Sequence, residues 1–108
     1  MEISFEDFKK VELRVGQIKS ADSMAGSEKL LKLMVNFGEF GQKQILAGLA
    51  KNYSPDSLTG IKAIFVFNLE PRKLMGLESQ GMILAADSAD GPVILKPEKD
   101  APPGSMVK

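Results

Sequence analysis

Short segments in which apolar and polar residues alternate recur along this sequence, and they restrict the chain to a fold built from β-strands. Leu31, Leu33, Val35 and Phe37 occupy every second position, which is the pattern of a strand with one buried face. Residues 61–69 are apolar at most positions, which is typical of a strand that is covered on both faces. The patterns together predict strands at 11–18, 31–37, 43–48, 61–69, 81–86 and 92–96.

The segments between these strands favour a barrel. Gly16 interrupts the alternation of the first strand, and a glycine at such a phase slip predicts a bulge or a sharp bend that helps a short sheet to curve. The polar residues 21–29 are expected to connect the first two strands, and residues 49–60 to form turns and one short inserted helix. This order predicts an all-β fold, a five-stranded Greek-key barrel of the OB-fold type. A two-sheet sandwich is the alternative.

The chain has 108 residues, a length that suits one domain with one core. Ser4 with Asp7 three residues later resembles a capping box and predicts a short helix at residues 5–10, which would plug one end of the barrel. Residues 97–108 are rich in proline and glycine and are expected to form a C-terminal extension. We therefore expect a single domain over residues 1–108, with about 1–10 as its N-terminal helix.

The composition excludes several kinds of site. The sequence contains no cysteine and no histidine, which removes disulfides, imidazole catalysis and the usual zinc ligands. It has no catalytic-serine or nucleotide-loop motif, so we expect no catalysis, no cofactor and no bound metal. It also lacks a long apolar run and a secretory leader, which favours a cytoplasmic protein that does not enter the membrane.

The connection over residues 68–82 carries the candidate binding groups. A hairpin needs only about two to five turn residues, and long connections on a rigid scaffold are common positions for binding residues. Hydrogen-bond donors are concentrated here, and further lysines lie on the first three strands. The candidates are Asn68, Arg72, Lys73, Ser79 and Gln80 on the connection, and Lys29, Lys32 and Lys43 on the strands.

Two interpretations of these residues remain open. Arginine binds phosphate through two parallel hydrogen bonds and lysine acts as a point charge, which favours polynucleotide binding. However, 14 basic and 14 acidic residues give a formal net charge of zero, so the same side chains could simply be solvated. With one tyrosine and no tryptophan, the chain has little on which unpaired bases could stack. If it binds nucleic acid, a folded RNA is the more natural partner.

Three segments resemble one known family, in the same order. They are FEDFKKVELRVGQI, KLLKLMVNFG and NLEPRKLMGLESQGMILAA. They are similar to the tRNA-binding domain found at the C-terminus of many methionyl-tRNA synthetases, as a free-standing tRNA-binding protein, and in the endothelial monocyte-activating polypeptide II group. The resemblance covers nearly the whole chain. It implies a homodimeric OB-fold that grips the outside of tRNA and recruits it to a synthetase catalytic body.

The resemblance also implies roles for individual residues. The tRNA contacts that it implies are Asn68, Arg72, Lys73, Ser79 and Met82, supported by Lys29, Lys32 and Lys43. The helix near Phe5 and Phe8 and the tail after Lys96 become candidates for the dimer interface. Glu70 stands where many relatives have a lysine, and an acid beside Arg72 weakens the attraction of phosphate. We therefore expect weak binding by one domain, improved when two are joined.

The alternative function is that of a dimeric, chaperone-like module that binds other proteins, as in the secretion-chaperone branch of the same family. Leu74, Met75, Leu77 and Met82 would then form an apolar patch for unfolded segments, because methionine adapts to varied partners.

Overall fold

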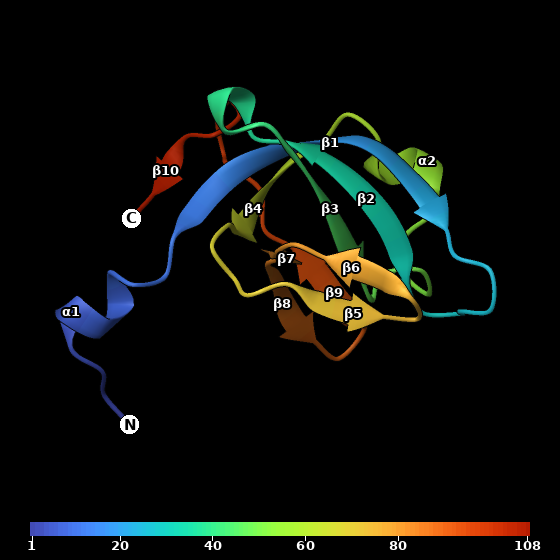
Figure 1. Cartoon of the computed structure of the whole chain (residues 1–108), viewed down its shortest axis with the longest axis horizontal. Helices are drawn as coiled ribbons and strands as arrows, with labels where there is room; N and C mark the ends of the chain where they lie inside the picture. The colour runs from blue at the N-terminus through green and yellow to red at the C-terminus, as the bar shows by residue number, and fades with distance from the viewer.

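The computed structural model describes all 108 residues, and β-strands dominate it (Figure 1). One sheet has the strand order β3-β2-β1-β4-β7, with every pair antiparallel, and β10 pairs with the start of β1. The bounds are α1 Phe5–Phe8, β1 Leu13–Ser23, β2 Leu31–Asn36, η1 Gly38–Phe40, β3 Gln42–Ala47, α2 Pro55–Leu58, β4 Lys62–Val66, β5 Arg72–Leu74, β6 Leu77–Ser79, β7 Met82–Ile83, β8 Ala85–Ser88, β9 Gly91–Ile94 and β10 Met106–Val107. The predicted all-β class is confirmed, as a nearly closed five-stranded barrel consistent with the OB-fold.

Hydrogen bonds from β3 to Ser79 at the end of β6 and to Gln80, just before β7, bring the two ends of the sheet together. The backbone N–H of Gln80 donates to the carbonyl of Gln44 at 2.8 Å, and the N–H of Gln44 donates to the side-chain oxygen of Gln80 at 2.8 Å. The N–H of Leu46 donates to the hydroxyl of Ser79 at 3.0 Å. Two of the three bonds therefore end on side chains, which replace the backbone carbonyls of a regular strand partner.

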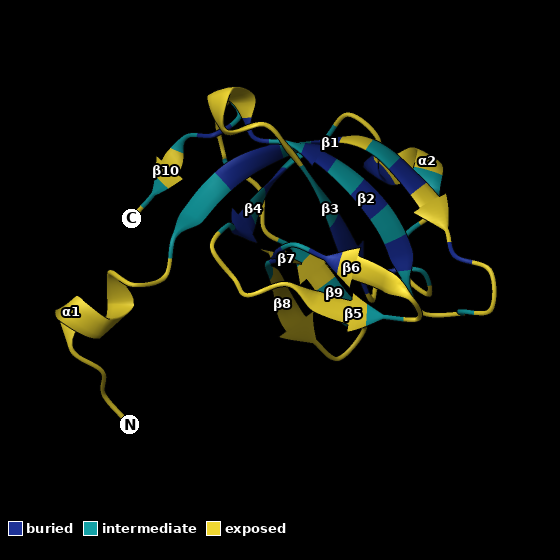
Figure 2. Ribbon diagram, viewed as in Figure 1, coloured by how far each residue is buried: buried dark blue, intermediate teal, exposed yellow.

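The core fills the barrel from the inner faces of its strands, and Figure 2 shows burial concentrated in β1 to β4. Ile18, Val35 and Phe65 are inaccessible to solvent. Helix α2 adds Leu58, which is 1% exposed and joins the same apolar cluster. This inserted helix was predicted, and its start follows from local chemistry because Ser54 accepts from the N–H of Ser57 and Pro55 occupies the first turn.

Strand β1 differs from its predicted extent. It continues through Ser23, so the first residues of the expected connection at 21–29 are strand. Its register against β2 shifts between Ile18 and Ser20, not at Gly16. Gly16 instead lies where the barrel interior has no room for a side chain, because a Cβ built there would lie 2.5 Å from Val35 and 2.9 Å from Phe65. A glycine is therefore needed at position 16 because the surrounding side chains leave no space for a Cβ atom.

The N-terminal helix was predicted correctly as a helix and wrongly as a plug. The hydroxyl of Ser4 accepts from the N–H of Asp7 at 3.1 Å, which is one half of the expected capping box. Helix α1 has only four residues, and none of them is buried. It lies away from the barrel, on the same side as the C-terminus (Figure 1). Sealing a barrel end would require buried apolar side chains, and α1 contributes none.

The strand predicted at 81–86 is divided into β7 and β8, and the strand predicted at 92–96 is β9, which begins at Gly91. Strand β7 extends the barrel sheet, while β8 and β9 form a separate hairpin with Ala89 and Asp90 in its turn. No helix in the structure has the length and apolar character needed to cross a bilayer.

Replacing Gly16 with alanine should lower the free energy of unfolding by about 1–3 kcal/mol, because the added methyl group overpacks the barrel. Urea denaturation measures this change. The control is Gly48→Ala, where a Cβ meets nothing within 4 Å, and we expect a change within about 0.5 kcal/mol there. Equal stability of the two variants would contradict this role of Gly16.

Candidate nucleic-acid interface

The long connection between β4 and β7 contains a hairpin of its own. Strands β5 and β6 pair Arg72 with Ser79 and Lys73 with Glu78. Met75 and Gly76 form the turn with φ angles of 51° and 83°, and positive values at both positions are characteristic of a two-residue type I′ turn. The unusual length of residues 68–82 is therefore explained by a small two-stranded arm attached to the barrel.

Ser79 anchors this arm to the barrel. It is the one buried polar side chain, 6% exposed, and its hydroxyl accepts from the N–H of Leu46 and donates to the carbonyl of Gly81 at 3.1 Å. The side-chain amide of Gln44 adds a bond to the carbonyl of Glu78 at 2.8 Å. Both hydrogen-bonding functions of the hydroxyl are thus used within the chain, which makes Ser79 a positioning residue in this structure.

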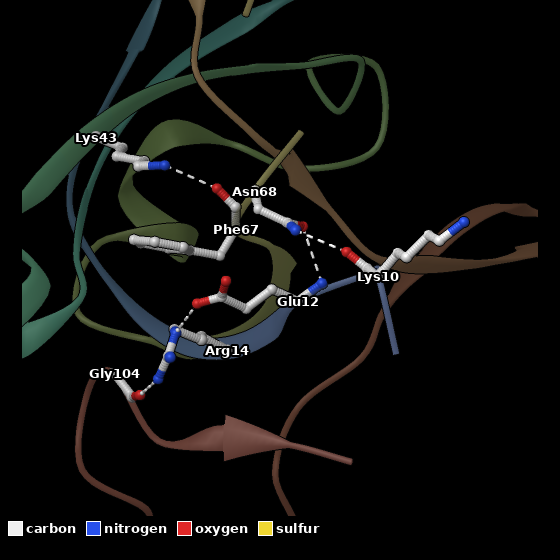
Figure 3. Close-up of polar contacts among 7 residues, drawn as sticks. All are labelled: Lys10, Glu12, Arg14, Lys43, Phe67, Asn68 and Gly104. Carbon is white, nitrogen blue, oxygen red and sulfur yellow. Dashed lines mark hydrogen bonds and ion pairs between the residues drawn. The ribbon is translucent and has the colours of Figure 1, made fainter. Parts of the chain in front are cut away.

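Asn68 anchors the other end of the arm to the segment that precedes β1. Its side-chain oxygen accepts from the N–H of Glu12 at 2.8 Å, and its side-chain nitrogen donates to the carbonyl of Lys10 at 2.7 Å (Figure 3). The side-chain amide of Asn68 is therefore hydrogen-bonded to two backbone groups more than 50 residues away in the sequence. Like Ser79, Asn68 has intramolecular partners for its polar side-chain atoms.

Two further cationic side chains near Asn68, those of Lys43 and Arg14, have intramolecular partners. Lys43 donates to the carbonyl of Phe67 at 2.7 Å, and its nitrogen lies 3.8 Å from the centre of the Phe67 ring. Arg14 contacts the carboxylate of Glu12 at 2.6 Å and the carbonyl of Gly104 at 2.7 Å (Figure 3). Arg14 was not among the predicted site residues. Glu12 is only two residues away, but Gly104 is 90 positions away, so the local sequence could not have shown that Arg14 ties β1 to the C-terminal segment.

The remaining basic residues of the arm are free. Arg72 and Lys73 are exposed, and their side chains take part in none of the hydrogen bonds or ion pairs of the structure. Arg72 lines a small pocket of about 70 Å³ together with Ser79, Met82 and Glu70. Met82 is 45% exposed on β7. The fold thus gathers several predicted site residues around one arm.

The lysines predicted on the first three strands do not form one group with this pocket. Lys29 lies in the loop before β2 and lines a separate groove at the tip of the arm. Lys32 is half-buried on β2, and Lys43 is held against Phe67 as described above. No cluster of carboxylates, histidines or cysteines is arranged to hold a metal ion. The exposed side chains at the arm, Arg72, Lys73 and Met82, can therefore supply cations for phosphate and an apolar contact.

Comparisons with known proteins show which family the chain resembles. Residues 13–106 match a family described as a putative tRNA binding domain. The methionine–tRNA ligase of Methanothrix thermoacetophila is 47% identical over 106 residues, which is 98% of this chain but only 16% of the ligase. The crystal structure of a MetRS-related protein from Pyrococcus horikoshii has a TM-score of 0.92 and 37% identity, with all of both chains covered. The chaperone CsaA from Bacillus anthracis, also covered completely, has a TM-score of 0.90 and 30% identity.

Replacing Ser79 with alanine should lower the free energy of unfolding by about 1–3 kcal/mol, because the buried N–H of Leu46 loses its acceptor. Thermal or urea denaturation measures the loss. Ser23→Ala on the exposed end of β1 is the matched control and should remain within about 0.5 kcal/mol of the parent. A Ser79 variant as stable as the control would show that this hydroxyl does not hold the arm.

Proposed function

The chain belongs to the family of putative tRNA-binding domains, and on this basis we propose that it binds folded tRNA and recruits it to a methionyl-tRNA synthetase. The domain itself is not catalytic. It spans 16% of the ligases it resembles, and it also covers the whole of a MetRS-related protein. The proposal therefore applies to a terminal domain of a synthetase and equally to a free-standing chain that acts beside one.

The observation that carries this proposal is the pair of free cations, Arg72 and Lys73, on an arm that is anchored at both ends. Because Asn68 and Ser79 fix the arm by hydrogen bonds, little conformational entropy is lost when phosphates bind. Fixed cations of this kind recognise the position of the phosphate backbone and carry no sequence information directly. Sequence-tolerant binding is the expected result.

A folded RNA suits this surface better than a single strand does. Single-strand binders stack bases on exposed aromatic rings. Here Phe37 and Phe65 are inaccessible to solvent, and Tyr53 is half-buried with its hydroxyl on the carbonyl of Pro92. The exposed rings of Phe5 and Phe8 lie on α1, away from the arm, and the ring of Phe40 is already in contact with the guanidinium of Arg14, 4.0 Å from the ring centre. Phosphate contacts and shape are what remain for recognition.

We further propose that two copies of the chain associate through the terminal segments. Phe5, Phe8 and Val11 line an apolar groove of about 480 Å³ together with Met106 and Val107. An isolated helix of only four residues is not stable in water, because helix nucleation is costly. A second copy that covers this groove would supply the missing packing. Dimerisation would also double the number of arms, which offsets the weakening caused by Glu70 beside Arg72.

Protein binding is the second candidate function, supported by the similarity to CsaA, which is named a chaperone. Met75, Leu77 and Met82 are 56%, 37% and 45% exposed, while Leu74 of the predicted patch is half-buried. An apolar partner would bind these side chains with little dependence on salt. Phosphate binding releases counterions and falls steeply as salt increases.

Replacing Arg72 and Lys73 together with alanine should weaken tRNA binding about tenfold or more at roughly 50 mM salt, because two phosphate contacts are lost. Fluorescence anisotropy with labelled tRNA measures the affinity. For the parent, neutralising about three to five phosphates predicts a fall of tenfold to several hundredfold between roughly 50 and 200 mM salt.

The control for this experiment is the double variant of Lys96 and Lys99, which line another groove beside Asp100. A single-stranded RNA of equal length tests the preference for a folded partner. Parent-like affinity of the Arg72 and Lys73 variant would refute the site, and salt-independent binding would favour the protein-binding function.

Replacing Phe5 and Phe8 with serine should convert the dimer to a monomer, because the apolar groove at the chain ends loses both rings. Sedimentation equilibrium gives the mass, and circular dichroism checks the barrel, which α1 does not help to bury. Val93→Ser, at a 50% exposed apolar residue of β9, is the control and should leave the mass unchanged. A parent chain that sediments as a monomer would contradict the proposed interface.

A further inference from the structure

Besides the small pocket beside Arg72, a groove with two lysines lies at the tip of the arm. It has a volume of about 660 Å³ and is bounded by the loop from Gly26 to Leu30, by Gly48 with Lys51, and by Met75 of the arm. Lys29 and Lys51 are its two cations, and both are exposed. Lys51 belongs to none of the sequence motifs that indicated a binding function.

Backbone hydrogen bonds fix the spacing of the two lysines. The N–H of Ala50, the residue before Lys51, donates to the carbonyl of Lys29 at 3.0 Å. The hydroxyl of Ser27 accepts from the N–H of Lys29 at 3.3 Å and from the N–H of Leu30 at 3.0 Å, which holds the loop in a tight turn. The two backbone segments are therefore joined directly, while neither lysine side chain has an ion-pair partner.

The groove is continuous with the arm. Met75 lies at the turn, and a Cβ built at Gly26 would lie 3.4 Å from the terminal carbon of the Met75 side chain. The tip of the arm therefore rests close to the loop that carries Lys29. Lys73 lies on β5, two residues before Met75 in the turn. A ligand that crosses the arm at Lys73 can thus pass its tip and enter the groove without leaving the protein surface.

The lining of the groove indicates which kind of ligand it suits. Only two of its eight lining residues are apolar, whereas pockets for small molecules are mostly apolar and enclose their ligand. The groove is open, polar and equipped with two unpaired ammonium groups. Such a surface suits an extended polyanion, which passes along it and exchanges its condensed counterions for the lysines.

We propose that this groove binds a second stretch of the phosphate backbone of the tRNA held by the arm, with Lys51 as a phosphate contact beside Lys29. The inference rests on the proposed tRNA-binding function and extends its footprint past the arm. Glu28 also lines the groove and opposes the phosphates there. Charge at position 28 and charge at position 51 therefore have opposite effects on tRNA affinity.

Lys51→Ala should weaken tRNA binding about three- to tenfold at roughly 50 mM salt and reduce the slope of log affinity against log salt by about one. Its control is Lys99→Ala, in the other groove beside Asp100, with an unchanged slope. Glu28→Gln should increase affinity about twofold or more, since it removes a repulsive charge. A gain of affinity cannot result from a damaged fold, so this variant separates the charge effect from unfolding.

The outcomes distinguish this inference from the function on which it rests. A lower slope for Lys51→Ala together with tighter binding by Glu28→Gln would support the groove. Parent-like slopes for both, while the Arg72 and Lys73 variant loses binding, would overturn the groove and leave the tRNA-binding function intact. Parent-like binding by all of these variants would overturn both.

Discussion

The hydrogen bonds that join β3 to Ser79 and Gln80 are the constraint on which the rest of the structure depends. A short curved sheet leaves unpaired N–H groups at its edge, and each buried one is costly. Here the N–H groups of Gln44 and Leu46 end on side-chain oxygens of the neighbouring segment. The same contact that closes the barrel therefore fixes the base of the arm, so fold and site are built by the same residues.

This dependence divides the polar residues of the arm into two groups. The uncharged ones, Asn68 and Ser79, bond to backbone groups elsewhere in the chain and determine where the arm lies. The side chains of the charged ones, Arg72 and Lys73, form no hydrogen bond or ion pair in the structure and remain available. A side-chain amide or hydroxyl has both a donor and an acceptor and can satisfy backbone groups of either kind, whereas an ammonium or guanidinium group can only donate.

The sequence predicted the secondary-structure elements better than the tertiary contacts between them. The alternation that marks β2 and the local pattern that predicted a short helix within residues 49–60 act over a few positions, and both elements were confirmed. Gly16 was correctly identified as unusual, but its reason lies in side chains of β2 and β4 that only the folded chain brings near. The bond from Asn68 to Lys10 spans 58 positions, so the sequence marked Asn68 as polar without revealing its partner.

The zero net charge of the chain is compatible with binding a polyanion because the opposite charges are not evenly paired. Three of the four ion pairs lie within residues 6–14, and the fourth joins Lys62 to Asp100. None of them involves the arm. Screening limits the reach of exposed charges to about 8 Å at physiological salt, so a bound phosphate responds to the local cations and not to the total. The two cations of the arm form no ion pair although Glu70 and Glu78 lie on the same segment, so the proposed tRNA contact would act at short range and be weak enough for ready release.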